Sequence, residues 1–206
     1  MLVLLGVVII TFILARIVPS DPASQWAGPR ATAEQVMAAQ VELGLDRPVY
    51  IQFAKYMDSL LHGDLGYSLQ THQPVSKELK TYLPATIELV LTATIFALLI
   101  GLILGVFSAS KKNQWPDHII RFFSVGFVAL PTFWFGLLLQ LIFYRILGIF
   151  PMGGQFSIDT QLFYTIPNIT GFMIFDSLIT GNIHILKDLL LHMVLPGITI
   201  AAYPIG

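Results

Sequence analysis

The chain has 206 residues, of which 55% are hydrophobic and only 11% are charged, and its formal net charge is −1. About a quarter of the residues in a typical soluble domain are charged, so this composition excludes an ordinary soluble globular protein. The absence of cysteine excludes disulfides, thiolate catalysis and cysteine-based metal sites, and the near-neutral charge gives no indication of nucleic-acid binding.

The first segment, residues 1–18, is apolar except for Arg16 and ends at the sequence PSDP. A signal peptide is the alternative interpretation, but the usual cationic start and a small-residue cleavage site are both absent. We therefore predict that residues 1–18 form a first transmembrane helix that is retained in the mature protein.

A polar region follows, because eight of the twelve acidic residues and five of the eleven basic ones lie between Asp21 and Glu88. A capping box of Thr32 and Gln35 predicts a helix that ends at Gly44. Apolar stripes then predict a second helix ending at Gly63 and a short third one at 75–82, before a proline. We interpret residues 19–83 as a small extracytoplasmic helical domain.

Two uncharged runs, 89–110 and 122–144, identify the chain as a membrane protein. Each run exceeds twenty residues and would form a helix roughly 33 Å long, enough to cross the ~30 Å hydrocarbon core of a bilayer. With their flanking residues, they predict spans at about 84–110 and 119–144.

Each of these spans has a feature that affects packing. Gly101 and Gly105 form a G-x-x-x-G pair, which predicts close packing against another helix. Pro131 removes a backbone donor from the next span and predicts a kink there, beside an aromatic group that includes Trp134.

The turn between the two spans contains Lys111, Lys112 and Arg121. Short loops rich in lysine and arginine remain cytoplasmic, which predicts a cytoplasmic N-terminus and an external 19–83 domain. After a second external segment, whose weakly apolar piece at 169–179 we interpret as re-entrant or interfacial, a fourth span is predicted at about 189–206. Because the chain stops within this apolar run, we expect it to be the N-terminal part of a longer protein.

Motifs for catalysis are missing from the sequence, which contains no H-E-x-x-H, G-x-S-x-G or Walker A pattern. We interpret His192 as a hydrogen-bonding group rather than a metal ligand. Arg16, Glu88 and Arg121 lie near predicted helix ends, where snorkelling toward water is the ordinary explanation for a charge. With no charge predicted in the central turns of a span, energy for transport would have to come from a partner.

Several short motifs occur in an informative order along the whole chain. They are PSDP (19–22), ELGLDRP (42–48), HGDLGYS (62–68), LPATIEL (83–89), ALPTFW (129–134), TGF (170–172) and HMVLP (192–196). This series resembles the dipeptide/oligopeptide/nickel permeases of ABC importers, and specifically their first permease subunit.

The resemblance implies an all-α integral membrane protein: a polytopic helical bundle that is part of a type I ABC importer transmembrane domain (84–206), with the extracytoplasmic insert. It implies an inner-membrane permease subunit for peptides or related solutes, which is not itself an enzyme and has no cofactor. Its partners would be a second homologous permease, two cytoplasmic ATPase subunits and an extracytoplasmic solute-binding protein. The family's ATPase-docking loop would lie beyond Gly206.

The candidate site residues are few. Pro131 and Trp134 could line the translocation path, although ordinary aromatic packing between spans is the alternative. Asp64, in a tight turn between Gly63 and Gly66, is a candidate for partner docking, with a local turn bond as the alternative. The rival functions are an intramembrane enzyme and a channel or scaffold subunit of another membrane complex. The solute itself cannot be read from the sequence.

Overall fold

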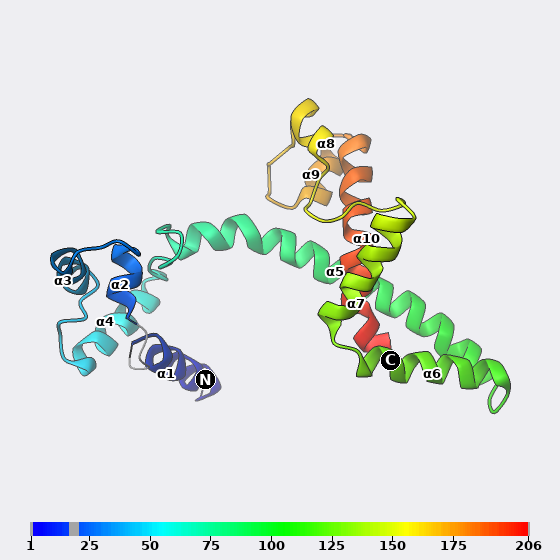
Figure 1. The fold of residues 1–206 in the computed structure, drawn as a ribbon, viewed down its shortest axis with the longest axis horizontal. Coiled ribbons are helices and arrows are strands. Elements are labelled where there is room, and N and C mark those ends of the chain that lie inside the picture. The colour runs from blue at the N-terminus through cyan, green and yellow to red at the C-terminus, as the bar shows by residue number, and fades with distance from the viewer. Residues whose placement is uncertain (1, 17–20, 206) are drawn as a thin grey trace. The chain divides into compact units, whose positions relative to one another are not determined.

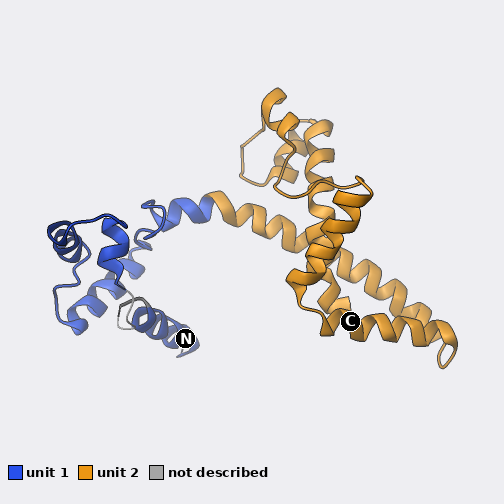
Figure 2. Cartoon of the chain, viewed as in Figure 1, with its two compact units in different colours: residues 1–80 blue, residues 81–206 orange. Residues whose placement is uncertain are grey.

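The computed structural model describes residues 2–16 and 21–205, and their secondary structure is helical, with no strand among these residues (Figure 1). This confirms the predicted all-α class. The chain divides into two compact units, Met1–Lys80 and Thr81–Gly206, which Figure 2 colours separately.

The first unit contains four short helices. They are α1 (Leu2–Arg16), α2 (Pro22–Ala27), α3 (Ala33–Glu42) and α4 (Val49–Leu61). The capping box predicted for α3 is confirmed, because the Thr32 N–H donates to Gln35 Oε1 at 2.8 Å and the Gln35 N–H donates to Thr32 Oγ1 at 3.4 Å. The chain leaves α3 through Gly44, whose φ of +67° suits a glycine after a helix.

Helix α1 is held to α4 by aromatic packing. The buried Phe12 ring lies 5.1 Å from the Phe53 ring and 5.7 Å from the Tyr56 ring, measured between centroids. The apolar part of α1, Leu2–Leu14, is shorter than the length a helix needs to cross a bilayer unaided. The first span therefore stays a prediction, and its last residues lie outside those described.

The second unit is entered along α5 (Val75–Ser110), a single helix of 36 residues. The prediction of a separate helix at 75–82 was wrong, because Pro84 lies inside α5 and does not end it. A proline inside a helix leaves one carbonyl without its N–H donor, and other groups must satisfy that carbonyl. The predicted boundary at 83/84 consequently falls within a continuous helix.

The remaining elements follow in the second unit. They are α6 (Trp115–Ala129), α7 (Thr132–Leu139), the π-helix η1 (Gln140–Ile146), α8 (Ile158–Phe163), α9 (Met173–Ile179) and α10 (Ile183–Ile205). Helices α5 and α10 are long and apolar enough to cross a membrane, and α6 with α7–η1 adds a third span if the bent pair counts as one. Helix α10 begins at Ile183 and so includes a polar turn before the predicted start at 189.

Helix α10 packs closely on its neighbours at two glycines. A Cβ built on Gly197 would lie 3.1 Å from the Phe96 ring of α5, and one on Gly136 of α7 would lie 3.2 Å from Thr199 Cγ2. The Cβ of any larger residue would crowd these contacts, so the two glycines allow the helix surfaces to meet. Ile185, Leu189 and Met193 of α10 form a buried cluster with Phe156.

The segment at 169–179 forms a tight turn followed by α9, and Asp176 organises it. The fully buried Asp176 carboxylate accepts hydrogen bonds from the backbone N–H groups of Ile169 (2.8 Å), Thr170 (3.1 Å) and Gly171 (3.3 Å), and from Thr170 Oγ1 (2.6 Å). Burial raises the pKa of Asp176, but these donors outweigh burial and hold the pKa below its ordinary value. The turn is therefore built on an ionised carboxylate.

We predict that Asp176→Asn opens this turn. An amide has one acceptor oxygen where the carboxylate has two, and its NH2 group faces backbone donors, so hydrogen exchange at Ile169 and Thr170 should accelerate about tenfold or more. Asp159→Asn is the matched control, because Asp159 is exposed on the neighbouring α8. Equal exchange rates in wild type and the Asp176 variant would contradict the prediction.

The same measurement has a defined pH dependence. Because the folded pKa of Asp176 is lowered, its stabilisation is complete above the unfolded value of about 3.9 and is lost as the pH falls through the folded value. After correction for intrinsic exchange, wild-type protection should stay constant from neutral pH down to about pH 5 and decline only below about pH 4. The Asn variant should lack this acid-dependent loss.

Candidate translocation site

The predicted third span is broken at Pro131 rather than only kinked. Helix α6 ends at Ala129, Leu130 is extended (φ −81°, ψ 135°), and α7 begins after Pro131, with an angle of 113° between α6 and the α7–η1 helix. A residue before proline is disfavoured in the helical region, which explains the extended Leu130. The Pro131 carbonyl then accepts from the N–H groups of Trp134 (3.0 Å) and Phe135 (3.1 Å) and starts the new helix.

Helix α7 continues directly into the π-helix η1. At its start, Gln140 Nε2 donates to the carbonyl of Met152 at 2.8 Å and so joins η1 to the following loop. Segments of π-helix are rare and occur frequently at functional sites. The break and the π-helix together interrupt regular α-helix twice between α6 and the end of η1.

The two predicted path residues lie at the start of α7, with Pro131 at its N-cap and Trp134 in its first turn. Trp134 is 44% exposed, whereas the neighbouring Phe133 is 72% exposed. The same helix meets α10 at Gly136. The structure thus places Pro131 and Trp134 together at the break, while their role in a path remains a prediction.

Glu88 was misread from the sequence, because it does not snorkel to water. Its side chain is buried, and Oε1 accepts a hydrogen bond from the Ile174 N–H at 2.7 Å, which caps the first turn of α9. Beside this bond, Pro84 Cγ approaches Gly171, where φ is +88° and a built Cβ would lie 3.4 Å away. Glu88 Oε2 is buried without a hydrogen-bond partner among the described residues.

A second carboxylate, Asp188, fixes the start of α10. Its Oδ2 accepts from the Ser157 N–H (2.8 Å) and from Ser157 Oγ (3.0 Å). The buried His192 lies one turn later, with Nδ1 at 2.8 Å from the Asp188 carbonyl and 3.4 Å from Asp188 Oδ1. His192 thus serves as a hydrogen-bonding group, as interpreted from the sequence.

Three histidine–aspartate pairs at i, i+4 spacing, one of them His184/Asp188, escaped the sequence analysis. Two of the three are in contact in the described residues. They are Asp188/His192, which is largely buried, and Asp58/His62, whose side chains are both about three-quarters exposed. Within residues 2–16 and 21–205, no three metal-ligating side chains are grouped as a metal site would require. These pairs therefore act as local contacts of their helices.

Asp64 makes the local turn bond that was the alternative to docking. Its Oδ1 accepts from the Gly66 N–H at 2.9 Å, and the turn uses φ values of +76° at Gly63 and +74° at Gly66. Asp64 itself is exposed and lies on the wall of a hollow of about 490 Å³ in the first unit. The turn bond accounts for Asp64 locally, and its role in partner docking stays a prediction.

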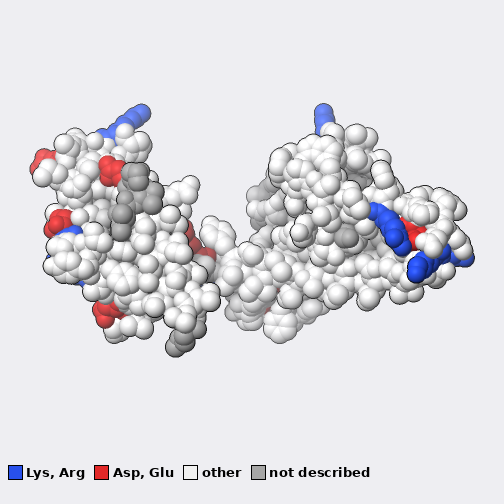
Figure 3. Space-filling model, turned by 90° about the horizontal axis from the view of Figure 1, so that it is seen from below, with Lys and Arg blue, Asp and Glu red and all other residues white. Residues whose placement is uncertain are grey.

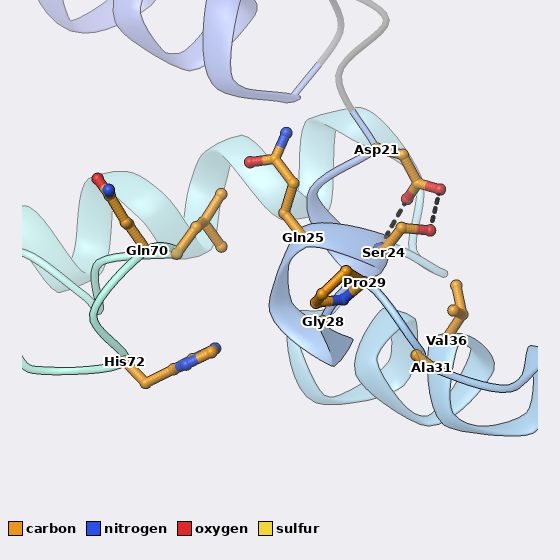
Figure 4. A pocket seen from close by; sticks show the side chains of 10 residues that line it. Asp21, Ser24, Gln25, Gly28, Pro29, Ala31, Val36, Gln70 and His72 are labelled. Atoms are coloured by element: carbon orange, nitrogen blue, oxygen red, sulfur yellow. Dashed lines mark hydrogen bonds between the residues drawn. The ribbon is translucent and has the colours of Figure 1, made fainter.

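A larger hollow in the first unit, about 860 Å³, is shown in Figure 4. His72 and Gln70 lie on one side of it, and Gln25 with the Gly28–Pro29 connection lies on the other. His72 has a positive φ of 56°, and its ring packs against Trp26 with 4.6 Å between centroids. Its Nε2 lies 3.1 Å from the Trp26 carbonyl, which holds the loop in this uncommon conformation.

The glycine pair of α5 shows no helix contact of the predicted kind in the described residues. A Cβ built on Gly101 or on Gly105 would meet no other atom within 4 Å. Both glycines instead lie on the wall of a hollow between α5 and α6. Close packing against another helix at this pair stays a prediction.

Glu88 is the long-range structural contact that sequence reasoning missed. The sequence did contain an indication, since an acidic residue at the edge of an uncharged membrane run usually pairs with another group of the protein. Its partner, the Ile174 N–H, is 86 residues away, and no local pattern reveals that contact.

Comparison with known proteins places these features in a family. Residues 1–90 match the family described as binding-protein-dependent transport system membrane component, N-terminal. The chain is 42% identical to the probable D,D-dipeptide transport system permease protein DdpB of Escherichia coli, over 100% of this chain and 59% of the relative.

Two further relatives have comparable similarity. Identity is 36% to the dipeptide transport system permease protein DppB of Alkalihalophilus pseudofirmus, over 99% of this chain and 60% of the relative. Identity is 37% to the di/tripeptide transport system permease protein DppB of Pseudomonas aeruginosa, over 98% of this chain and 59% of the relative. The chain thus spans about three fifths of the length of these relatives. Its sequence similarity to them over 98–100% of its own length shows that it belongs to the membrane-component family of binding-protein-dependent transport systems.

Proposed function

We propose that this chain belongs to a permease subunit of an ATP-driven, binding-protein-dependent importer of peptides or related solutes. The observation that carries the proposal is the similarity over the whole chain to three permeases whose names specify dipeptides or di- and tripeptides. In this proposal the subunit forms half of the translocation path, and solute crosses by alternating access.

The broken span supports a path near Pro131 and Trp134. Irregular backbone at membrane depth is tolerated where it is buried in protein or lines a water-filled cavity. The break leaves the last carbonyls of α6 without intrahelical donors, and Pro131 has no N–H. Such groups would suit a polar solute with amide groups, so we propose that this segment faces the path.

The partners proposed for the subunit are a second homologous permease, two cytoplasmic ATPases and an extracytoplasmic solute-binding protein. Three carboxylates of the second unit support an energy source outside this subunit. Glu88, Asp176 and Asp188 all accept hydrogen bonds from backbone N–H groups of loops or helix starts. Residues held in this way serve the structure and do not form a chain for proton transfer.

For the orientation, we propose a cytoplasmic N-terminus and an external polar domain in a multi-pass inner-membrane protein. The basis is the lysine-rich α5–α6 turn. The external domain would then help to receive the binding protein, through the hollow of Figure 4 and the exposed Asp64.

Transport by the full-length protein is the direct test. Reconstituted in proteoliposomes with its second permease, ATPase and binding protein from the same organism, it should take up radiolabelled dipeptide only when ATP is present on the ATPase side. The purified full-length protein should also retain the ATPase. Uptake without ATP would indicate a channel, and peptide cleavage without uptake would indicate an intramembrane enzyme; either result would overturn the proposal.

Residue 134 offers a test of the path by cysteine labelling, because residues 1–206 contain no cysteine and any cysteine elsewhere in the full-length protein is first replaced by serine. In the reconstituted full-length protein, we expect Trp134→Cys to react with a water-soluble thiol reagent and transported dipeptide to slow that reaction severalfold. Phe133→Cys is the matched control, since Phe133 is the more exposed neighbour on the same turn. Protection by substrate at both positions, or at neither, would remove Trp134 from the path.

Asp64→Asn separates docking from turn formation. Asparagine retains an Oδ1 acceptor for the Gly66 N–H but lacks the charge, so the turn should persist. We expect the affinity for the solute-binding protein, measured with the full complex in nanodiscs, to fall about threefold to fivefold, as for the loss of one exposed interfacial charge. The control is Asp159→Asn, and an unchanged affinity in the Asp64 variant would leave this residue with its turn bond alone.

A further inference from the structure

A hollow of about 680 Å³ lies between the end of α5 and the start of α6. Its walls include Leu104, Gly105, Lys112, Asp117 and Arg121, with Ile205 of α10. One end of the hollow is therefore cationic and the other apolar. Figure 3 shows basic side chains gathered where α5 turns into α6, with acidic atoms among them.

The acidic group in the hollow is already saturated. The buried Asp117 carboxylate accepts from Ser108 Oγ, from the Asn113 N–H at 2.9 Å and from Arg121 Nε at 3.0 Å. This network closes the α5–α6 turn and holds the Arg121 side chain in place. Asp117 can balance only one positive charge of the group formed by Lys111, Lys112 and Arg121.

The remaining donors are available to an anion. Arg121 bonds Asp117 only through Nε among the described residues, and its side chain is 63% exposed, so its terminal Nη groups are open to another acceptor. Lys112 is exposed on the same hollow. A guanidinium with an ammonium beside it is a favourable arrangement for a phosphate group.

The apolar end of the hollow is open along α5. Gly101 and Gly105 leave space in which a built Cβ meets nothing within 4 Å, and Leu104 lies between them on the same wall. An acyl chain could lie in this groove with the headgroup at the cations. A free phosphate ion would use the cationic end alone and would leave the groove empty.

We propose that this hollow binds an anionic phospholipid, with its phosphate at Lys112 and Arg121 and an acyl chain along Gly101 and Gly105. The site combines charge complementarity with an apolar groove at the end of two membrane-depth helices, where a lipid headgroup resides. It does not depend on the solute, on the ATPase or on which side of the membrane the turn faces.

The test uses the full-length protein in phosphatidylcholine nanodiscs that contain a minor fraction of phosphatidylglycerol. Native mass spectrometry should show retained phosphatidylglycerol in the wild type. Lys112→Gln should lower that retention about fivefold, because it removes one of the two cations that contact the lipid phosphate in this proposal. Lys111→Gln is the matched control, because it removes the same charge from the same turn but Lys111 does not line the hollow, and it should change retention less than twofold.

Gly105→Leu tests the groove, since it fills the apolar end without altering charge. It should also reduce retention, and inorganic phosphate at millimolar concentration should not displace the lipid. Equal losses for Lys111→Gln and Lys112→Gln would reduce the effect to surface charge and overturn the proposal. Displacement of the lipid by inorganic phosphate would also overturn the proposal. Full lipid retention by Gly105→Leu, together with loss of the second permease, would overturn it too, because it would identify a helix as the occupant of the groove.

Discussion

Each backbone N–H and C=O at bilayer depth must find a partner within the protein, because the lipid core offers none. Helices α5 and α10 meet this requirement with long, nearly continuous hydrogen bonding, even around Pro84 and Pro196. Where continuity fails, between α6 and α7, Leu130 still donates to the Gly126 carbonyl, and Pro131 has no donor to satisfy. At the break the missing N–H of Pro131 leaves no donor unpaired, whereas Pro84 and Pro196 show that a proline alone does not end a helix.

The same requirement explains four of the five acidic residues of the second unit. Glu88 caps α9 at Ile174, Asp176 gathers the N–H groups before that helix, Asp188 binds Ser157, and Asp117 closes the α5–α6 turn at Asn113. Each carboxylate supplies acceptors where the chain cannot bond itself. These four carboxylates thus attach loops and helix starts to the rest of the second unit.

Packing divides the membrane helices into a closed and an open side. Thr199 and Phe96 occupy the space beside Gly136 and Gly197, so α10 fits tightly against α7 and α5. Gly101 and Gly105 present an equally small surface with nothing on it. An open apolar surface of this kind is where another molecule is expected to bind.

The sequence by itself determined membrane residence, helical class and family, because these depend on local composition, on uncharged runs and on short motifs read in order. It also located the α3 capping box and the Asp64 turn, whose partners are two or three residues apart. Only the tertiary structure decided that Glu88 is buried under α9, that α5 continues through Pro84, and which glycines carry helix contacts. Those outcomes depend on groups that folding brings together from distant parts of the chain. The order of residues in the sequence does not give the spatial distance between such groups.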